Sequence, residues 1–340
     1  MARREGQARG VAFWPAVPKF NWERALRPAP APATGQPHVT VTAGIQVAAA
    51  GTAPTPHDRL AAQLIQAGPS LTVTVPAHTV HGRVTITGSA TQGGVINLQV
   101  GAGATVHIAE TWRGQASGQT RLLVSLTLAA DAQVDYQTYD LYGDTAVVIE
   151  RRVTCGANSQ LTWRSASFGH HAGILYHAVD LVGDGAQAQA NMAVLAGGHA
   201  RLTATTAVTN AATNTQGLIN QHGVITDHAQ LILNGIGHIL LGARGSDAQQ
   251  ENRVLMLSPH ALGEANPLLL IDENDVTAGH AASVAAVDEH QLWYFLSRGV
   301  ARPVALRLVL RGFLLALLPD SMSKALRDEI QQLIEVQLNG

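Results

Sequence analysis

The sequence predicts a mainly β protein whose body is a parallel β-helix, with an extended and helical segment before it and a small α-helical domain after it. Three observations predict this fold. β-Branched or Leu-rich runs with period-two alternation follow one another from Leu71 to about Val276, separated by Gly, Asp, Asn and Pro. A small-residue turn recurs at nearly constant spacing through the same region. Aromatic residues make up only 4% of the chain, which suits strands stacked in register around a narrow interior.

The repeat is a small turn residue followed two positions later by an inward-facing apolar residue. Its members are Ala104/Val106, Ala132/Val134, Ser159/Leu161, Ala186/Ala188 and Ala229/Leu231. The first three steps are 28, 27 and 27 residues, and the last, 43, fits one repeat plus a half step through Ala200 and Leu202. One coil cannot bury its apolar face until a neighbour covers it, so even steps favour stacked coils. A β-sandwich would show shorter and less even intervals.

Three domains are expected: a Pro-rich segment with a short helix (1–70), the β-helix core (71–287) and a helical domain (288–340). Six prolines between Pro15 and Pro37 indicate an extended segment rather than regular secondary structure. A short helix is expected from Pro56 to about Ala67, with its apolar face formed by Leu60, Leu64 and Ile65.

The stretch 275–299, DVTAGHAASVAAVDEHQLWYFLSRG, joins the body to the tail. Its second half predicts a helix that Asp288 caps, with Gln291 three residues later, and that Gly299 ends. Leu292, Phe295 and Leu296 fall on one face of this helix.

This stretch resembles the DVKCSHGAT(V/I)G…LDEEQLFYLRSRG signature of the SufB/SufD family, the scaffold subunits of SUF iron–sulfur cluster assembly. The shared residues include Asp275, Val276, His280, Asp288, Glu289 and the final SRG of this stretch. VPAHTVHGRVTITG and the stretch 214–276 resemble the family's coils, so the similarity covers roughly residues 57–340. It implies a right-handed parallel β-helix and a SufD-like, non-catalytic scaffold. Ala278 stands where many members have Cys.

The family also implies a role for His280, as a ligand near iron or a nascent cluster at the interface between two β-helix subunits. One imidazole cannot complete a coordination sphere, so the partner must supply the other ligands. The isolated chain is therefore expected to bind no cofactor tightly, and to meet iron or a nascent Fe–S cluster transiently in a complex. The other histidines lack metal-ligand spacing and read as surface or coil-turn residues. Cys155, the only cysteine, reads as a small apolar residue of a strand.

The tail from residue 300 predicts two helices. The first, from Pro303 to Leu318, is apolar on most of its faces, which indicates a docking surface. The family implies that its partner is the SufC-type ABC ATPase, and the expected docking residues are Leu306, Val309, Leu310, Phe313 and Leu314. The alternative is that this helix packs on the end of the coils and caps the open sheet edge. Both helices are too short and too charged to span a membrane.

Pairing is expected through the late, apolar strands LILNGIGHILLG and PLLLID, with a SufB-type subunit or, in isolation, with a second copy of the chain. A net charge of −2 gives no reason to expect nucleic acid or a membrane as partner. The N-terminus has no apolar run of signal-peptide length, so a cytoplasmic protein is expected.

An enzyme is the alternative, because carbohydrate-active enzymes also use β-helices and gather acidic residues on one face of the coils. The densest acidic cluster here, Asp131, Asp135, Asp140, Asp144 and Glu150, belongs to about one coil. No P-loop motif is present, so the chain is not itself the ATPase.

Overall fold

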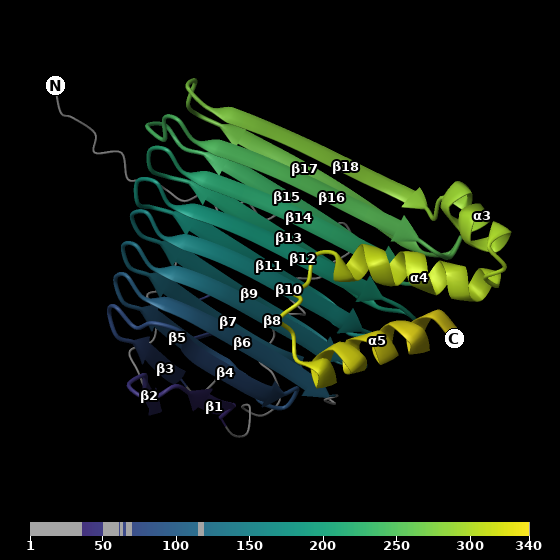
Figure 1. Cartoon of the computed structure of the whole chain (residues 1–340), viewed down its shortest axis with the longest axis horizontal. Helices are drawn as coiled ribbons and strands as arrows, with labels where there is room; N and C mark the ends of the chain where they lie inside the picture. Colours follow the sequence, from purple (N-terminus) through teal and green to yellow (C-terminus); the bar gives the residue numbers. More distant parts are fainter. Residues whose placement is uncertain (1–35, 50–60, 62–63, 66–69, 115–118, 340) are drawn as a thin grey trace.

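A computed structural model describes residues 36–49, 61, 64–65, 70–114 and 119–339. Within these residues the chain is a solenoid of two parallel sheets, followed by three C-terminal helices that lie beside it (Figure 1). The prediction of a parallel β-helix body is confirmed, because every strand pair from β3 to β18 is parallel. Consecutive strands alternate between the sheets, so each coil contributes one strand to each.

The first sheet, called sheet A, has the order β1-β4-β6-β8-β10-β12-β14-β16-β18. Its strands are β1 (His38–Val41), β4 (Gly82–Ser89), β6 (Thr105–Gly114), β8 (Gln133–Tyr142), β10 (Gln160–Gly169), β12 (Gln187–Ala196), β14 (Gln216–Ile225), β16 (Asp247–Met256) and β18 (Thr277–Ala286).

The second sheet, sheet B, has the order β17-β15-β13-β11-β9-β7-β5-β3-β2. Its strands are β2 (Gln46–Ala49), β3 (Ser70–Val75), β5 (Gly94–Val100), β7 (Gln119–Leu128), β9 (Ala146–Cys155), β11 (Ala172–Leu181), β13 (Arg201–Asn210), β15 (Gln230–Ile239) and β17 (Leu262–Ile271).

The sequence repeat corresponds to the turn that precedes each strand of sheet A. The residue before the buried turn position has positive φ in six successive coils, at Gly103, Asp131, Asn158, Gly185, Asn214 and Gly245. Glycine, asparagine and aspartate are the residues that tolerate this left-handed conformation. The 43-residue step is also explained, since Ala186 precedes a strand of sheet A whereas Ala200 and Ala229 precede strands of sheet B.

Side chains alternate between the interior of the solenoid and its outer faces, and the parallel register aligns them in columns. One column of sheet A runs through Trp163, Ala190, Ile219, Gln250 and His280. Trp163 and Ile219 belong to the main core, so every member of this column faces the interior.

Two short N-terminal strands were not predicted. β1 pairs antiparallel with β4, and β2 pairs antiparallel with β3, so together they extend both sheets at the first coil. Of the expected helix 56–67, the described residues Ala61, Leu64 and Ile65 are helical. Ala61 and Leu64 are buried against Val95, Leu123 and Val148 on the outer face of sheet B. The remainder of that helix and the Pro-rich stretch 1–35 lie outside the described residues.

The helices are α3 (Glu289–Ser297), α4 (Arg302–Leu315) and α5 (Lys324–Asn339). α4 and α5 lie across the carboxyl ends of the sheet A strands (Figure 1), where α4 packs on β12 and β14 and α5 packs on β10. A second hydrophobic cluster forms between sheet A and these two helices. Its members include Phe168, Leu195 and Val224 from the sheet and Leu310, Leu314, Ile330 and Ile334 from the helices. None of the helices that the structure describes is both long and apolar enough to cross a bilayer.

Candidate functional site

The C-terminal end of the solenoid is open. β18 is the last strand of sheet A and β17 the last strand of sheet B, and no strand within the described residues pairs with their outer edges. Leu262, Ile271 and Val284 on these strands are 55%, 46% and 39% exposed. An edge that combines unpaired backbone groups with exposed apolar side chains is a surface on which another chain can pair.

The two apolar runs expected at this interface lie in different places. PLLLID belongs to β17 at the edge. LILNGIGHILLG belongs mostly to β15, which pairs with β13 on one side and β17 on the other. Only the β17 run therefore borders the open end.

His280 lies on β18 at this open end. Its position belongs to the inward-facing column, directly after Gln250 on the neighbouring strand. The side chain is nevertheless exposed, because β18 is the last described strand of its sheet and no further coil among the described residues covers it. His280 thus stands at the mouth of the solenoid interior, where a partner chain that extends the sheets would meet it.

The described part of the chain does not supply the further ligands that a metal bound at His280 would need. Among the described residues there is no group of three or more His, Cys, Asp or Glu side chains that could hold a metal ion. The position that carries Cys in many SufB/SufD proteins is Ala278, two residues before His280 on the same strand. A metal at His280 would therefore need ligands from outside the described part of this chain.

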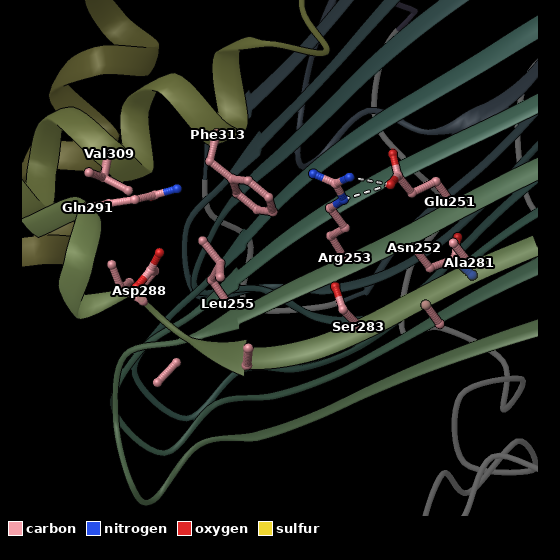
Figure 2. A pocket seen from close by; sticks show the side chains of 14 residues that line it. Glu251, Asn252, Arg253, Leu255, Ala281, Ser283, Asp288, Gln291, Val309 and Phe313 are labelled. Atoms are coloured by element: carbon pink, nitrogen blue, oxygen red, sulfur yellow. Dashed lines mark hydrogen bonds and ion pairs between the residues drawn. The ribbon is translucent and has the colours of Figure 1, made fainter.

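A groove of about 620 Å³ runs between this end of sheet A and the helices (Figure 2). Small residues of β18, among them Ala281, Ser283 and Ala285, form one side, and Gln291, Val309 and Phe313 of the helices form the other. Arg253 and Glu251 on β16 make a hydrogen-bonded ion pair inside it. The groove is therefore mostly apolar, and its charged groups are this ion pair and the Asp288 carboxylate.

His222 on β14 holds one wall of the groove in place, although no motif in the sequence had singled it out. The ring of His222 stacks on Phe313 with centroids 4.1 Å apart. Burial lowers the pKa of His222, so the ring is neutral near pH 7 and its Nδ1–H donates to the Phe313 carbonyl at 2.7 Å. This contact ties α4 to β14. The interpretation of His222 as a surface or coil-turn residue is therefore wrong.

The helix that begins at Glu289 is capped as predicted, since Asp288 accepts a hydrogen bond from the His290 amide at 2.9 Å. Gly299, with φ +80°, follows its end. Leu292 is buried, whereas Trp293 and Tyr294 are 69% and 55% exposed. Arg302 at the start of α4 makes two hydrogen bonds with Glu289, at 2.7 and 2.8 Å, which hold the two helices together.

The five expected docking residues divide between the two faces of α4. Leu310 and Leu314 are fully buried against sheet A, while Leu306, Val309 and Phe313 are half-buried. The apolar side chains that remain exposed on this helix are Val304 and Leu308, at 40% and 43%. A partner can therefore contact Val304 and Leu308 directly, but it cannot reach Leu310 or Leu314. The helix lies on the outer face of sheet A and not along the β18 edge.

The interior of the solenoid contains a charged network that sequence reasoning missed. Arg151 donates to both Asp140 oxygens at 2.8 and 2.9 Å and to Glu110 at 3.3 Å, and all three side chains are almost completely buried. Burial by itself disfavours the Arg151 cation, but the two carboxylates outweigh it and hold its pKa well above the usual value. Tyr136 also donates to Glu110.

Two histidines that were expected on the surface or in turns are buried in the body. Burial and the nearby Arg151 hold the pKa of His177 well below its usual value, and its ring stacks on Trp163 with centroids 4.3 Å apart. Burial lowers the pKa of His171 to about 4, and its Nε2 lies 2.8 Å from the Ser167 hydroxyl. Strand periodicity could have identified His177 as buried, because it lies two residues from Leu175 and two from Val179 and so shares their inward face.

Cys155 is a buried strand residue, as expected, and burial raises the pKa of its thiol to about 12. It is therefore protonated and shielded near neutral pH, which argues against a nucleophilic role.

The acidic residues considered for an enzymatic function do not all lie on the same face of sheet A. Asp140 faces the interior and pairs with Arg151, whereas Asp135 faces outward, 3.0 Å from His107 and 2.7 Å from Arg164. Glycoside hydrolysis needs two carboxyl groups flanking one substrate bond. These two carboxylates lie on opposite faces of one sheet, so they cannot act together.

Comparison with known proteins bears on the same region. A family model described as "SUF system FeS cluster assembly, SufBD core domain" matches residues 84–313. The chain is 38% identical over 216 residues to an iron–sulfur cluster assembly protein SufD of Bacillus subtilis, an alignment that covers 63% of this chain and 49% of that protein.

More distant relatives align over a similar stretch. An iron–sulfur cluster assembly SufBD family protein of Mycobacterium bovis is 27% identical over 64% of this chain and 26% of its own length. One of Staphylococcus saprophyticus is 24% identical over 66% of this chain and 47% of its own length. The alignments thus span half or less of these relatives.

Proposed function

The chain belongs to the SufBD core family of the SUF iron–sulfur cluster assembly system, and from this membership we propose that it is a non-catalytic, SufD-like scaffold subunit of a cytoplasmic assembly complex. The observation that carries the proposal is the open end of the solenoid. There the family signature, His280 and two strand edges that no other described strand pairs with come together at one exposed surface. A scaffold needs such a surface, and the buried ion pairs and buried thiol described above provide no free acid, base or nucleophile.

The partner at the open end is proposed to be a SufB-type subunit, with a second copy of this chain taking its place in isolation. Pairing there would extend both sheets, satisfy the edge backbone groups and cover Leu262, Ile271 and Val284. It would also enclose His280 between two chains, where a shared iron or cluster site can form.

The second partner is proposed to be a SufC-type ABC ATPase that docks on the helices. The exposed large apolar residues of α3 and α4 are Trp293, Tyr294, Leu296, Val304 and Leu308. Exposed aromatic and aliphatic groups of this kind are typical interface anchors. Substitutions in this set test docking better than removal of residues 300–340 does. Such a deletion would uncover the apolar outer face of sheet A around Phe168 and Leu195, so it would affect the coils as well.

Cluster formation in the reconstituted complex tests the role of His280. We expect His280→Ala to leave folding and assembly intact, because the side chain is exposed at the end of the solenoid. Cluster yield, followed by absorbance and iron content, should fall severalfold because one ligand is lost. The matched control is His290→Ala, which removes another exposed histidine from α3.

Three results are informative. A misfolded or unpaired His280→Ala variant would show that the histidine is structural. An unchanged cluster yield would show that it takes no part in the shared site. An equal loss of yield in the His290→Ala control would show that the effect is not specific to the open end.

A further inference from the structure

Three buried amide side chains face the interior of the last coils. Gln221 and Asn252 are fully buried, and Gln250 is 5% exposed. Gln221 and Asn252 are register partners on β14 and β16, and Gln250 precedes Asn252 in the next inward-facing column. Ile219 and Val254 on the same strands belong to the main core, so these amides project into an otherwise apolar interior.

Hydrogen-bond partners are missing around these amides within the described residues. Gln221 uses its Nε2 to donate to Thr206 Oγ1 at 2.8 Å, and Gln250 uses its Nε2 to donate to the Leu268 carbonyl at 3.0 Å. The Leu268 carbonyl can only accept, so its bond fixes the nitrogen of Gln250, whereas the Thr206 hydroxyl can donate or accept. In this arrangement both Oε1 atoms are without a donor. Asn252 has no partner for Oδ1 or Nδ2 in the described part of the chain. Buried polar groups almost always have partners.

The amides of Gln250 and Asn252 meet over a residue without a side chain. A Cβ at Gly235 on β15 would lie 2.5 Å from Gln250 Oε1 and 2.7 and 2.9 Å from Asn252 Nδ2 and Oδ1. The φ angle of Gly235 lies outside the left-handed region, so backbone conformation does not require glycine here. The absent side chain instead leaves room for the two amides.

Gln250 and Asn252 on β16 lie one coil below the open end, and Gln221 on β14 lies two coils below it. Beyond Asn252 in its column stands Ala282, which is exposed and small. Asn252 also contributes to the wall of the groove beside β18 (Figure 2). A small molecule that enters at the end of the solenoid therefore has only the β18 coil to pass before it reaches Gln250 and Asn252.

We propose that Gln221, Gln250 and Asn252, above Gly235, form an internal binding site for a small guest that donates N–H or O–H hydrogen bonds. The unpartnered acceptor oxygens require a donor. The three side chains carry no formal charge, so the site does not compensate a divalent cation. Water and the ammonium ion share the required donor chemistry and size. This site goes beyond the scaffold function and is present in the chain by itself.

High-resolution crystal structures of the full chain test the proposal, with Gly235→Ala and Gly237→Ala as matched variants. A Cβ at Gly237 would meet only carbon atoms, Leu269 Cδ2 at 2.9 Å and Ala248 Cβ at 3.8 Å, so that variant controls for added volume. We expect a density peak within hydrogen-bond distance of Gln250 Oε1 in the wild type and in Gly237→Ala. The peak should be lost in Gly235→Ala.

Soaking the crystals in thallium(I), an anomalous scatterer that replaces ammonium and potassium, identifies the source of the guest. An anomalous peak at the site indicates a monovalent cation, and a peak without anomalous signal indicates water. The proposal is overturned if the wild type shows no peak and the amides pair with protein groups instead. If Gly235→Ala does not fold, Asn252→Leu takes its place, and the peak beside Gln250 should then weaken or disappear.

Discussion

Arg151 illustrates how single residues inside the solenoid hold neighbouring coils in register. It lies on β9 and pairs with Asp140 on β8 and Glu110 on β6, so one side chain joins three strands of two sheets. The sequence could not have revealed this network. Polar residues alternate on both faces of these strands, and the carboxylate partners lie 11 and 41 residues away along the chain.

Replacing Arg151 with methionine should destabilise the fold by about 3–5 kcal/mol, because it leaves Glu110 and Asp140 buried without their cation. Chemical denaturation measures the change. The matched control is Arg253→Met, which removes an ion pair whose arginine is 51% exposed and should cost at most about 1 kcal/mol. Equal effects of the two substitutions would contradict the structural role of the network.

Stability should also fall on acidification because of His171. Folding lowers the pKa of His171 from 6.5 to about 4, so the unfolded chain takes up the proton first as the pH falls. The contribution is fully present above about pH 6.5 and is lost toward pH 4, at about 1.4 kcal/mol per pH unit. His177, whose pKa is also lowered, adds a loss of the same sign.

Urea unfolding at pH 7, 6 and 5 measures this dependence. In His171→Asn the free energy of unfolding should change less steeply with pH, by the amount that corresponds to about one proton taken up on unfolding. This difference in slope does not depend on the stability of the variant at pH 7. The exposed His290, changed to asparagine, should leave the slope as in the wild type. An unaltered slope in His171→Asn would show that its ring is not held neutral by the fold.

At the scale of elements, the strands and turns were predictable because the physics is local and repeated. A left-handed residue at each turn demands Gly, Asn or Asp, and a narrow interior demands small residues after it, so the coil leaves a period in the sequence. β1 and β2 were missed because their short strands follow a Pro-rich stretch and are stabilised by pairing with β4 and β3.

The helices were predictable in position but not in packing. Capping residues and apolar spacing marked α3 and the two tail helices. Nothing local indicated that Leu310 and Leu314 would pack on sheet A, because the apolar face they meet comes from strands more than 80 residues earlier in the chain. One apolar face of α4 therefore packs on sheet A, and its other apolar face is exposed and available to a partner.

The two faces of α4 should respond differently to substitution. Leu308→Glu should leave the fold intact and weaken ATPase-subunit binding, since it places a charge on an exposed apolar face. Leu314→Ala should cost about 2–5 kcal/mol of stability through the cavity it leaves, with little change in binding by the folded fraction. Pull-down with the ATPase subunit and thermal unfolding separate the two effects. Undiminished binding by Leu308→Glu would remove this face from the docking surface.

At the scale of the whole molecule, the fold has one protected end and one open end. The first coil is covered by antiparallel pairing with β1 and β2, whereas no strand in the described part of the chain pairs with the outer edges of β17 and β18. The position of His280 at that open end was foreseen only through the family signature. Its place in an inward-facing column depends on the register of every coil before it, which no local pattern specifies.

The central claim is that the open end is an interface, and native mass measurement after coexpression with SufB-type and SufC-type subunits tests it most directly. The account predicts a single complex containing this chain together with both subunits. Val284→Lys, which places a charge on the apolar edge strand, should release the chain from its SufB-type partner while leaving it folded. A wild-type chain that remains monomeric at micromolar concentration, alone and with both subunits present, would contradict the account.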